Sequence, residues 1–436
     1  MMKIFFMMLM VIPICFFKKF WLLNQFVYLI LYFMVLVMSY SNFFVKISYF
    51  TGLDLFSYNL VMLSFMISSL MVISMSGSHN LNFYFFVNLC LVFFLLMIFG
   101  SLNFLYMYIS FEFVLVPLVV LILGWGYQPE RLMAGLYLFF YTLMVSLPLL
   151  ILILYLYNYS GCMFFDYMKN NSTFFLYHFI MMFVFMVKLP MYLVHFWLPK
   201  AHVQAPVSGS MILAGLMLKI GGYGLIRIMY MYEYMYINYS YIWYSLSLVG
   251  SILVSMICLI QGDIKSLIAY SSISHMGMVI MGLLTMKTWG LMGSYMLMLS
   301  HGFCSSAMFY MANLFYMRTG SRSFFVNKGL IVYMPSSSMF WFILCAFNMS
   351  CPPSMNFISE LMILSSMLSF WINSFLYFIM ISFFCACFSY YLYSYSQHGL
   401  FSNMYTFSMM NMLEYLCLTM HIAPLIFLPL MMLSFF

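Results

Sequence analysis

Apolar residues follow one another in runs of about 20, the length that a helix needs to cross a bilayer, and short polar or Gly/Pro-rich stretches separate the runs. The runs lack the regular alternation that marks the strands of a membrane barrel. Because lipid offers no hydrogen-bond partner to the backbone, each run predicts a transmembrane helix. Cutting at the polar stretches gives about fourteen spans. The expected spans are residues 4–17, 20–39, 58–76, 83–99, 104–124, 132–157, 174–198, 206–230, 240–260, 266–285, 289–316, 336–369, 371–395 and 415–436.

Two of these predicted spans contain a proline break next to a charged residue. In the seventh span Pro190 follows Lys188, and in the twelfth Cys351-Pro352-Pro353 precedes Glu360. Proline removes a backbone donor and clashes with the preceding turn, so both helices are expected to be discontinuous. Interrupted helices at matching places in two halves of a transporter mark an ion path. The alternative is an ordinary proline kink, which is common in membrane helices.

The composition agrees with a membrane protein. Of the 436 residues, 67% are hydrophobic and 5% are charged, whereas soluble domains carry about 25% charged residues. No segment is long and polar enough to fold outside the membrane, so a single membrane domain, residues 1–436, is expected. The opening run MMKIFFMMLMVIPICFF lacks a small-residue cleavage site and is expected to be the first span rather than a signal peptide. The 51 methionines, beside many Phe and Tyr, are typical of an AT-rich organelle genome; adaptable packing alone does not require so many.

Four ionisable side chains lie in the middle of apolar runs, in a chain with few other charges: Glu112, Lys188, Lys219 and Glu360. A charge at mid-bilayer costs about 2.5–3.5 kcal/mol, so four cost about 10–14 kcal/mol, which rivals the net stability of a domain. Such groups persist where they are paired, hydrated or used, and the arithmetic favours use in transport. Static pairing of Glu112 with Lys188 is the alternative, but it leaves the other two residues unexplained.

Histidines accompany these charges at positions that suit a proton relay. His195 and His202 follow Lys188 at intervals of seven, so on a continuous helix all three would line one stripe. His275 and His301 add an imidazole to each of two later spans. Histidine titrates near neutral pH and can pass a proton through either ring nitrogen, although any single one can instead be a structural contact. Four more histidines lie near predicted span ends and are interpreted as structural: His79, His178, His398 and His421.

Loop charges predict the orientation in the membrane. With Lys188 and Lys219 set aside, eight of the 15 basic residues fall on one set of alternate loops, and five fall on the other. The positive-inside tendency places the richer side in the matrix or cytoplasm, with both termini opposite. No basic tract predicts nucleic-acid binding. The richer set is Lys18, Lys19, Arg131, Lys200, Lys265, Arg318, Arg322 and Lys328, and the other is Lys3, Lys46, Lys169, Arg227 and Lys287.

Other chemistries find little support in the sequence. Gly221-Gly222-Tyr223-Gly224 lies inside an apolar run, where small residues allow close helix packing rather than phosphate binding. No HExxH, CxxCH, paired-carboxylate or nucleophile-elbow motif occurs. Arg318, Arg322 and Lys328 can hold an acidic lipid head group, although solvated loop charges are the alternative. An embedded di-haem site is a further alternative, with ligands drawn from His178, His195, His275 and His301.

Three long stretches resemble a known family. They are GWGYQPERLMAGLYLFFYTLMVSLP (124–148), KLPMYLVHFWLPKAHVQAPVSGSMILAGLMLKIGGYGLIR (188–227) and DIKSLIAYSSISHMG (263–277). These stretches are similar to the chain 4 family of NADH–ubiquinone oxidoreductase, the antiporter-like membrane subunits of respiratory complex I. The similarity covers most of the chain and is weakest before residue 50 and in the last two spans. The segments PERLMAGLY and SISHMG resemble an insect-like mitochondrial member of this family.

The resemblance implies fourteen helices, the number of spans expected above. They are arranged as inverted repeats at residues 83–230 and 240–395, with discontinuous seventh and twelfth helices. It also implies a proton channel along a hydrated central axis. In the family, a glutamate at the place of Glu112 pairs with a lysine at the place of Lys188. One departure is Gln204, which replaces the usual acid of an HVEAP stretch; a neutral amide can still hold water, so only a helper role is in doubt there. The other positions that match the axis are Lys219, Glu360, His195, His202, His275 and His301.

Partners and cofactors are likewise implied by the resemblance. NADH, FMN, iron–sulfur clusters and ubiquinone are bound by other subunits, with no cofactor and no metal in this chain. The expected neighbours are the antiporter-like chains 2 and 5 and membrane lipids such as cardiolipin. The expected location is the mitochondrial inner membrane, and the loop charges place both termini on the intermembrane-space side. The predicted function is proton translocation driven by remote electron transfer from NADH to ubiquinone. Three alternatives stay open: a stand-alone cation/proton antiporter, a structural member that only spans the membrane arm, and a haem-binding electron carrier.

Overall fold

Apolar helices account for most of the chain in the computed structural model, which describes residues 2–17, 21–37, 47–48, 51–77, 79–168, 174–400 and 407–430. An apolar segment in lipid satisfies its backbone groups best within a helix, because no other hydrogen-bond partner is at hand. Among the described residues, 9 helices are long and apolar enough to cross a membrane, and shorter apolar helices accompany them. The predicted all-helical membrane class is confirmed.

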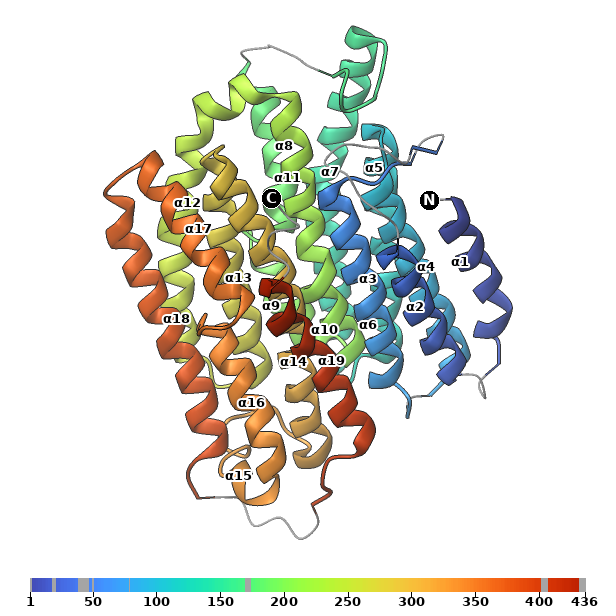
Figure 1. Ribbon diagram of the computed structural model, residues 1–436, viewed down its shortest axis with the longest axis vertical. Helices are drawn as coiled ribbons and strands as arrows, with labels where there is room; N and C mark the ends of the chain where they lie inside the picture. Colours follow the sequence, from blue (N-terminus) through green and yellow to red (C-terminus); the bar gives the residue numbers. More distant parts are fainter. Residues whose placement is uncertain are drawn as a thin grey trace. The chain divides into compact units, whose positions relative to one another are not determined.

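Two units make up the chain, and each is described by itself. The first unit comprises residues Met1–Leu189 and Gln204–Tyr239. In it α8 and α11 run side by side (Figure 1). Its helices are α1 (Met2–Cys15), α2 (Trp21–Leu36), α3 (Leu55–Ser74), α4 (Leu81–Gly100), α5 (Phe104–Phe113), α6 (Leu115–Trp125), α7 (Arg131–Ser160), α8 (Phe175–Lys188), α10 (Val207–Ile212), the π-helical turn η2 (Leu213–Met217) and α11 (Leu218–Met231).

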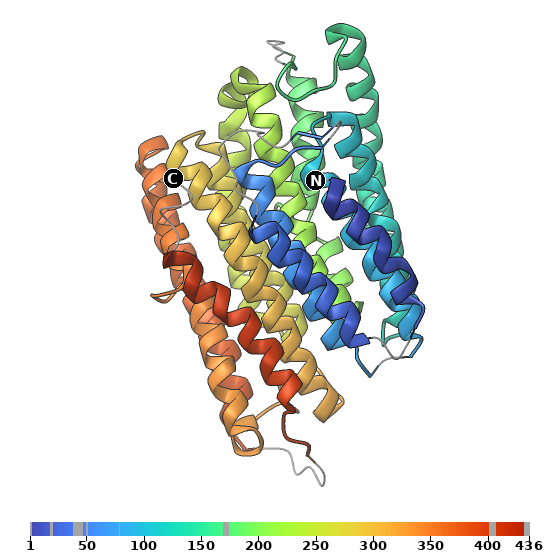
Figure 2. The ribbon, with the colours of Figure 1, turned by 45° about the vertical axis from the view of Figure 1, so that its right-hand side comes forward.

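The second unit comprises residues Pro190–Val203 and Ser240–Phe436. Within it α19 runs along α14, as Figure 2 shows. Its helices are α9 (Trp197–Gln204), whose last residue belongs to the first unit, α12 (Glu233–Ile260), whose first turns belong to the first unit, α13 (Ile264–Leu284), α14 (Thr288–Thr319), α15 (Leu330–Tyr333), α16 (Pro335–Asn348), α17 (Met355–Phe370), α18 (Ser374–Gln397) and α19 (Met412–Phe427).

Helices end at both of the predicted proline breaks. α8 ends at Lys188, and the next residue, Leu189, has φ −81° and ψ 100°. This extended conformation is what the residue before a proline favours, here Pro190. In the later break, α16 ends at Asn348 and α17 begins at Met355. An apolar segment therefore loses its helical conformation twice, each time next to a predicted transport residue.

Glycines bring α11 close to α8 in the first unit. A Cβ placed on Gly224 would lie 2.0 Å from the ring of Phe185, and one on Gly221 would lie 2.8 Å from the backbone nitrogen of Leu189. Neither position has room for a side chain, because the backbones meet at Gly221 and the ring of Phe185 fills the space at Gly224. The close packing predicted for this glycine cluster is confirmed at these two residues.

A glycine also allows close helix packing in the second unit, between α14 and α17. A Cβ on Gly293 of α14 would lie 2.8 Å from the Cβ of Met362 and 3.0 Å from the carbonyl oxygen of Ser359. Both of these residues belong to α17. Small residues thus set the distance between the helix that carries His301 and the helix that carries Glu360.

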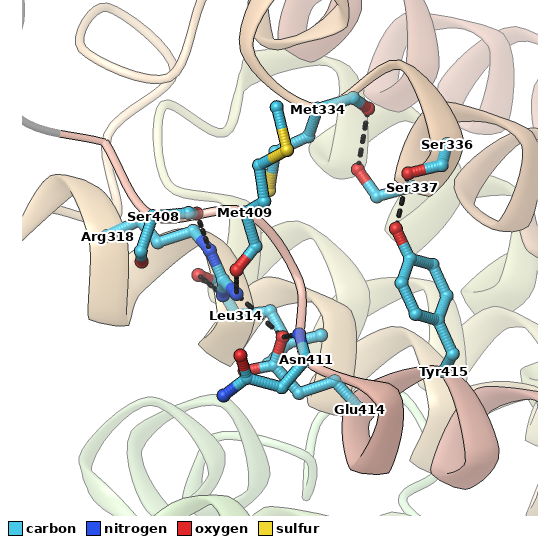
Figure 3. A network of polar contacts seen from close by, with 10 residues as sticks. All are labelled: Leu314, Arg318, Met334, Ser336, Ser337, Ser408, Met409, Asn411, Glu414 and Tyr415. Carbon is cyan, nitrogen blue, oxygen red and sulfur yellow. Dashed lines mark hydrogen bonds and ion pairs between the residues drawn. The ribbon is translucent and has the colours of Figure 1, made fainter.

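Arg318 ties the end of α14 to the start of α19 (Figure 3). Its Nη2 contacts Oε2 of Glu414 at 2.6 Å, and its Nε donates to the carbonyl of Ser408 at 2.8 Å. Glu414 also accepts a hydrogen bond of 3.0 Å from the backbone nitrogen of Asn411, at the first turn of α19. The Arg318 side chain is 4% exposed, so its charge is matched by protein groups within the second unit.

Two basic residues that the sequence places in loops are buried within helices instead. Arg227 belongs to α11 and Lys265 to the first turn of α13, and they are 8% and 2% exposed. The loop assignment of both is wrong, because each lies in the outermost turns of an apolar helix that other helices cover. Four more basic residues of the orientation argument lie outside the described residues: Lys18, Lys19, Lys46 and Lys169.

We expect Gly221→Ala to destabilise the protein by about 1–3 kcal/mol, because overpacking against a backbone atom cannot be relieved by moving a side chain. The measurement is thermal unfolding of the protein in its native membrane. Gly124→Ala in α6 is the matched control, since no atom lies within 4 Å of the place that its Cβ would take. The control should keep or raise stability, because alanine favours a helix more than glycine does. An equal loss in both variants would contradict the packing argument.

Candidate functional site

Glu112 and Lys188 face each other in the first unit. Glu112 lies at the end of α5, and Lys188 is the last residue of α8. The Lys188 ammonium lies 3.9 Å from the centre of the Phe111 ring, and the residue is 2% exposed. The two charges interact electrostatically, but in the described part of the chain no ion pair within 4.0 Å joins them. Glu112 and Lys188 thus form a loose pair, and small movements of either side chain change the energy of their electrostatic interaction.

The Lys188 ammonium also lacks a hydrogen-bond partner among the described residues. A buried ammonium without an acceptor is strongly unfavourable, so Lys188 must be hydrated, lose its proton or rely on the charge of Glu112. The ring face of Phe111 offers a weak cation–π contact in place of a hydrogen bond. Such a site can bind and release a proton at little structural cost.

Lys219 has a firmer contact, made to an irregular helical turn. It follows η2 closely, at the second residue of α11, and is fully buried. Its Nζ donates to the carbonyl oxygen of Ala214 at 2.5 Å. A π-helical turn is wider than an α-helical one and is common at functional sites. Here the wider turn brings a backbone carbonyl within reach of the lysine five residues further on.

A second group of predicted residues meets in the second unit, where α13, α14 and α17 pack together. Oε1 of Glu360 lies 3.9 Å from Nδ1 of His275. The rings of His275 and His301 are 5.6 Å apart, centre to centre. Ser350, in the break between α16 and α17, donates a hydrogen bond to Oε1 of Glu360. The order Ser350, Glu360, His275 and His301 thus forms a row of polar groups across three helices.

His195 and His202 lie in the second unit but do not share a helix with Lys188. His195 lies between α8 and α9 and stacks with Phe196 at 4.6 Å and with Tyr192 at 5.5 Å. His202, on α9, stacks on Phe309 of α14 at 4.8 Å, with an angle of 8° between the rings. The single stripe that a continuous helix would give is therefore wrong, because the chain leaves the helix at the proline break.

Gln204 has a specific partner that the sequence argument did not foresee. Its Nε2 donates to Oε2 of Glu130 at 3.0 Å. Glu130 is exposed and directly precedes α7, whereas Gln204 is 7% exposed at the end of α9. An amide can donate to this carboxylate, which a second carboxylate could do only when protonated.

The hydrogen-bond partners of Glu360 and Lys219 could not be predicted from the sequence. Ser350 is one serine among many, and it is singled out only by the break in which it lies. The Ala214 carbonyl is a backbone group, and no residue pattern around it predicts a π-helical turn. Among the described residues, no three of His, Cys, Asp and Glu gather in a way that could hold a metal ion.

Comparison with known proteins identifies the class to which this fold and site belong. Residues 101–389 match the family described as NADH:quinone oxidoreductase/Mrp antiporter, TM. Residues 1–98 match NADH-ubiquinone oxidoreductase chain 4, amino terminus. The protein is thus an antiporter-like membrane subunit of the oxidoreductase class. It belongs to the chain 4 family of NADH–ubiquinone oxidoreductase, and is therefore a subunit of that enzyme.

Insect relatives match along nearly the whole chain. Identity to NADH-ubiquinone oxidoreductase chain 4 of Ceratitis capitata is 49%, over 98% of this chain and 97% of that protein. Identity to chain 4 of Aedes aegypti is 46%, over 97% of this chain and 96% of that protein. The predicted resemblance to an insect-like chain 4 is confirmed.

Solved structures share the fold at lower identity. A chain of respiratory complex I from Thermus thermophilus superposes with a TM-score of 0.87 and 19% identity, covering 98% of this chain and 95% of that one. A chain of the membrane-bound sulfane sulfur reductase, an archaeal respiratory membrane complex, gives 0.80 and 18%, covering 92% and 69%. The antiporter-like fold is thus shared by respiratory membrane complexes that differ widely in sequence.

We expect the loss of the Ser350 hydroxyl to change the hydrogen bonding of Glu360. Ser350→Ala and Ser350→Gly both remove the donor, and both should shift the carboxyl stretching band of Glu360 in difference infrared spectra, with Glu360→Gln assigning the band. Ser350 has φ 61°, a conformation that favours glycine, so the glycine variant should be the more stable of the two by about 1 kcal/mol. An unchanged band in both variants would show that Ser350 is not the partner of Glu360.

Proposed function

We propose that this chain is a proton-translocating subunit of the membrane arm of mitochondrial complex I, driven by remote electron transfer from NADH to ubiquinone. Membership of the chain 4 family supports the assignment to the complex. The observation that carries the transport role is the burial of titratable groups in apolar helices without a matching fixed charge, above all Lys188. Buried ionisable residues in membrane segments are expensive, and they mark proton and ion routes.

In this proposal Glu112, Lys188 and Lys219 carry protons in the first unit. Lys188 is poised to titrate because Glu112, the one charge that acts on it among the described residues, lies beyond ion-pair distance. Movement of either residue changes the distance between the two charges, and so stabilises or destabilises the protonated form of the lysine. The Ala214 carbonyl accepts a hydrogen bond from the Lys219 ammonium and holds it in place. A carbonyl cannot take the proton itself, so Lys219 passes its proton to a water molecule or to another titratable group of the route.

The second unit supplies imidazoles and a carboxylate for the rest of the route. His301, His275 and Glu360 lie in a row. An imidazole can take up and release a proton near physiological pH, and a buried carboxyl group can do the same. The 3.9 Å between His275 and Glu360 exceeds a hydrogen bond, so a water molecule or a small rotation completes the contact. His195 and His202 serve as further relay positions on the segment that follows the first break.

The energy of one opening pair is too small to drive a proton across the membrane. At an effective dielectric of 20, two charges at 4 Å or more gain at most about 4 kcal/mol. Moving one proton against about 200 mV costs about 4.6 kcal/mol. Several coupled steps, or changes in hydration, must therefore act together, which accounts for a row of titratable groups rather than a single lysine.

The finer architecture forms part of the same proposal. We infer fourteen membrane-spanning helices, about the number of apolar runs, with α8/α9 and α16/α17 as two discontinuous helices of inverted repeats at residues 83–230 and 240–395. Both termini face the intermembrane space of the inner membrane. Chains 2 and 5 are the proposed neighbours, cardiolipin is a proposed lipid partner, and other subunits hold NADH, FMN, iron–sulfur clusters and ubiquinone.

Each alternative function makes a different experimental claim. A stand-alone cation/proton antiporter would show Na⁺-dependent transport by the isolated chain. A haem carrier would give a haem spectrum when the chain is purified. A structural member of the arm would support normal pumping after its buried charges are removed, and this last alternative is the one that substitution tests directly.

We expect Lys188→Met in the assembled complex to abolish or strongly reduce proton pumping per electron, because the substitution removes a titratable group and retains the bulk of the side chain. The measurement is acidification by the complex in sealed vesicles during NADH oxidation. Lys200→Met is the matched control, since Lys200 is exposed on α9. Normal pumping by Lys188→Met would favour the structural alternative and overturn the mechanism.

A further inference from the structure

A buried ion pair in the first unit lies outside the proton route proposed above. Nη2 of Arg227, on α11, contacts Oδ2 of Asp54, the residue before α3, at 2.5 Å. Nε and Nη2 of Arg227 also donate to the hydroxyl of Tyr223, at 2.9 and 2.8 Å. That hydroxyl donates in turn to the carbonyl of Phe99, near the end of α4, at 2.9 Å. The Arg227 and Asp54 side chains are 9% and 8% exposed, so the pair is largely removed from water.

Arg227 differs from the lysines of the route because its charge is permanent. A guanidinium keeps its proton in proteins, so Arg227 cannot pass protons on. Its planar fork of donors instead holds Asp54 and Tyr223 in one fixed arrangement. Burial raises the pKa of Asp54, Arg227 opposes that rise, and Asp166 acts in the same direction as burial. Removing either member of the pair would leave the other charge buried and uncompensated.

This cluster of Asp54, Tyr223 and Arg227 fixes the helix that carries Lys219. Arg227 and Lys219 lie eight residues apart on α11, about 12 Å along the helix, with Tyr223 midway between them. On one side of α11 the cluster ties it to the start of α3 and the end of α4. Two other residues of α11, Gly221 and Gly224, contact the end of α8. The position of α11 is therefore set by both groups of contacts.

We propose that Arg227, with Tyr223 and Asp54, is a positioning residue that sets the place of Lys219 relative to α8, the helix that ends at Lys188. The proposal rests on the proposed function, in which both lysines carry protons. At an effective dielectric of 20, moving a charge by about 1 Å from a partner at about 4 Å shifts its titration by about half a pH unit. A slight displacement of α11 thus changes the pH dependence of transport without removing any transporting group.

The test compares two variants in the assembled complex, reconstituted into sealed vesicles. Tyr223→Phe keeps the ring and removes the hydroxyl that links Arg227 to α4. Arg227→Lys keeps the charge and removes the planar fork. We expect both variants to assemble, and the pH midpoint of proton pumping per electron to shift by about half a unit or more in each.

Arg318→Lys is the matched control for the charge substitution. It weakens a comparable ion pair, with Glu414, at a point 17 residues from His301 on α14, about 25 Å along the helix. The route also touches α14 at Phe309, on which His202 stacks, nine residues or about 14 Å along the helix from Arg318. The control should therefore leave the pH midpoint unchanged.

The variant Lys219→Met distinguishes the positioning role of Arg227 from the proposed function on which that role rests. If Lys219→Met abolishes pumping while Tyr223→Phe and Arg227→Lys leave the midpoint unchanged, the positioning role is wrong and the proposed function stands. If Lys219→Met pumps normally, the proposed function itself fails. Loss of assembly in both positioning variants, or an equal midpoint shift in Arg318→Lys, would mean that the cluster only holds the fold together, which also overturns the proposal.

Discussion

The burial of charge inside apolar helices is the constraint on which the rest of this structure depends. Lipid supplies neither hydrogen bonds nor counter-charges, so every buried ionisable group must find them within the protein or in trapped water. The chain has few charged residues, and those it buries occur where helices end, break or pack closely. Where a charge lies therefore follows from where the backbone and its neighbours can provide a partner.

Two kinds of buried charge pair occur among the described residues. Arg227 with Asp54, and Arg318 with Glu414, form close pairs of 2.5 and 2.6 Å that further hydrogen bonds support. The pair of Glu112 and Lys188 is loose, and its ammonium lacks a hydrogen bond among the described residues. Arginine does not titrate and suits a permanent pair, whereas lysine changes its protonation state readily when buried. The choice of cation thus matches the closeness of the pair, which separates fixed contacts from groups able to exchange protons.

The helices were predictable because long apolar runs have one stable solution in lipid. The span expected at 206–230 and the helical segment at Val207–Met231 agree closely, and the break after Lys188 follows from Pro190. The burial of Arg227 was not predictable, because its partner Asp54 lies far away in the sequence. The same holds for Ser350, whose role depends on a contact with Glu360 across the break. Local pattern determines helices, whereas pairing between distant segments depends on how those helices pack.

Each of the four titratable residues lies next to an irregularity in its helix. Glu112 is the penultimate residue of α5 and Lys188 is the last residue of α8. Lys219 follows the π-helical turn, and Glu360 lies in the second turn of α17 after the break. Irregular backbone inside an apolar segment exposes carbonyls and hydroxyls that a regular helix would keep to itself, and it is tolerated only where protein or water surrounds it. The Ala214 carbonyl and the Ser350 hydroxyl are two such groups, so these two interruptions supply polar partners for Lys219 and Glu360.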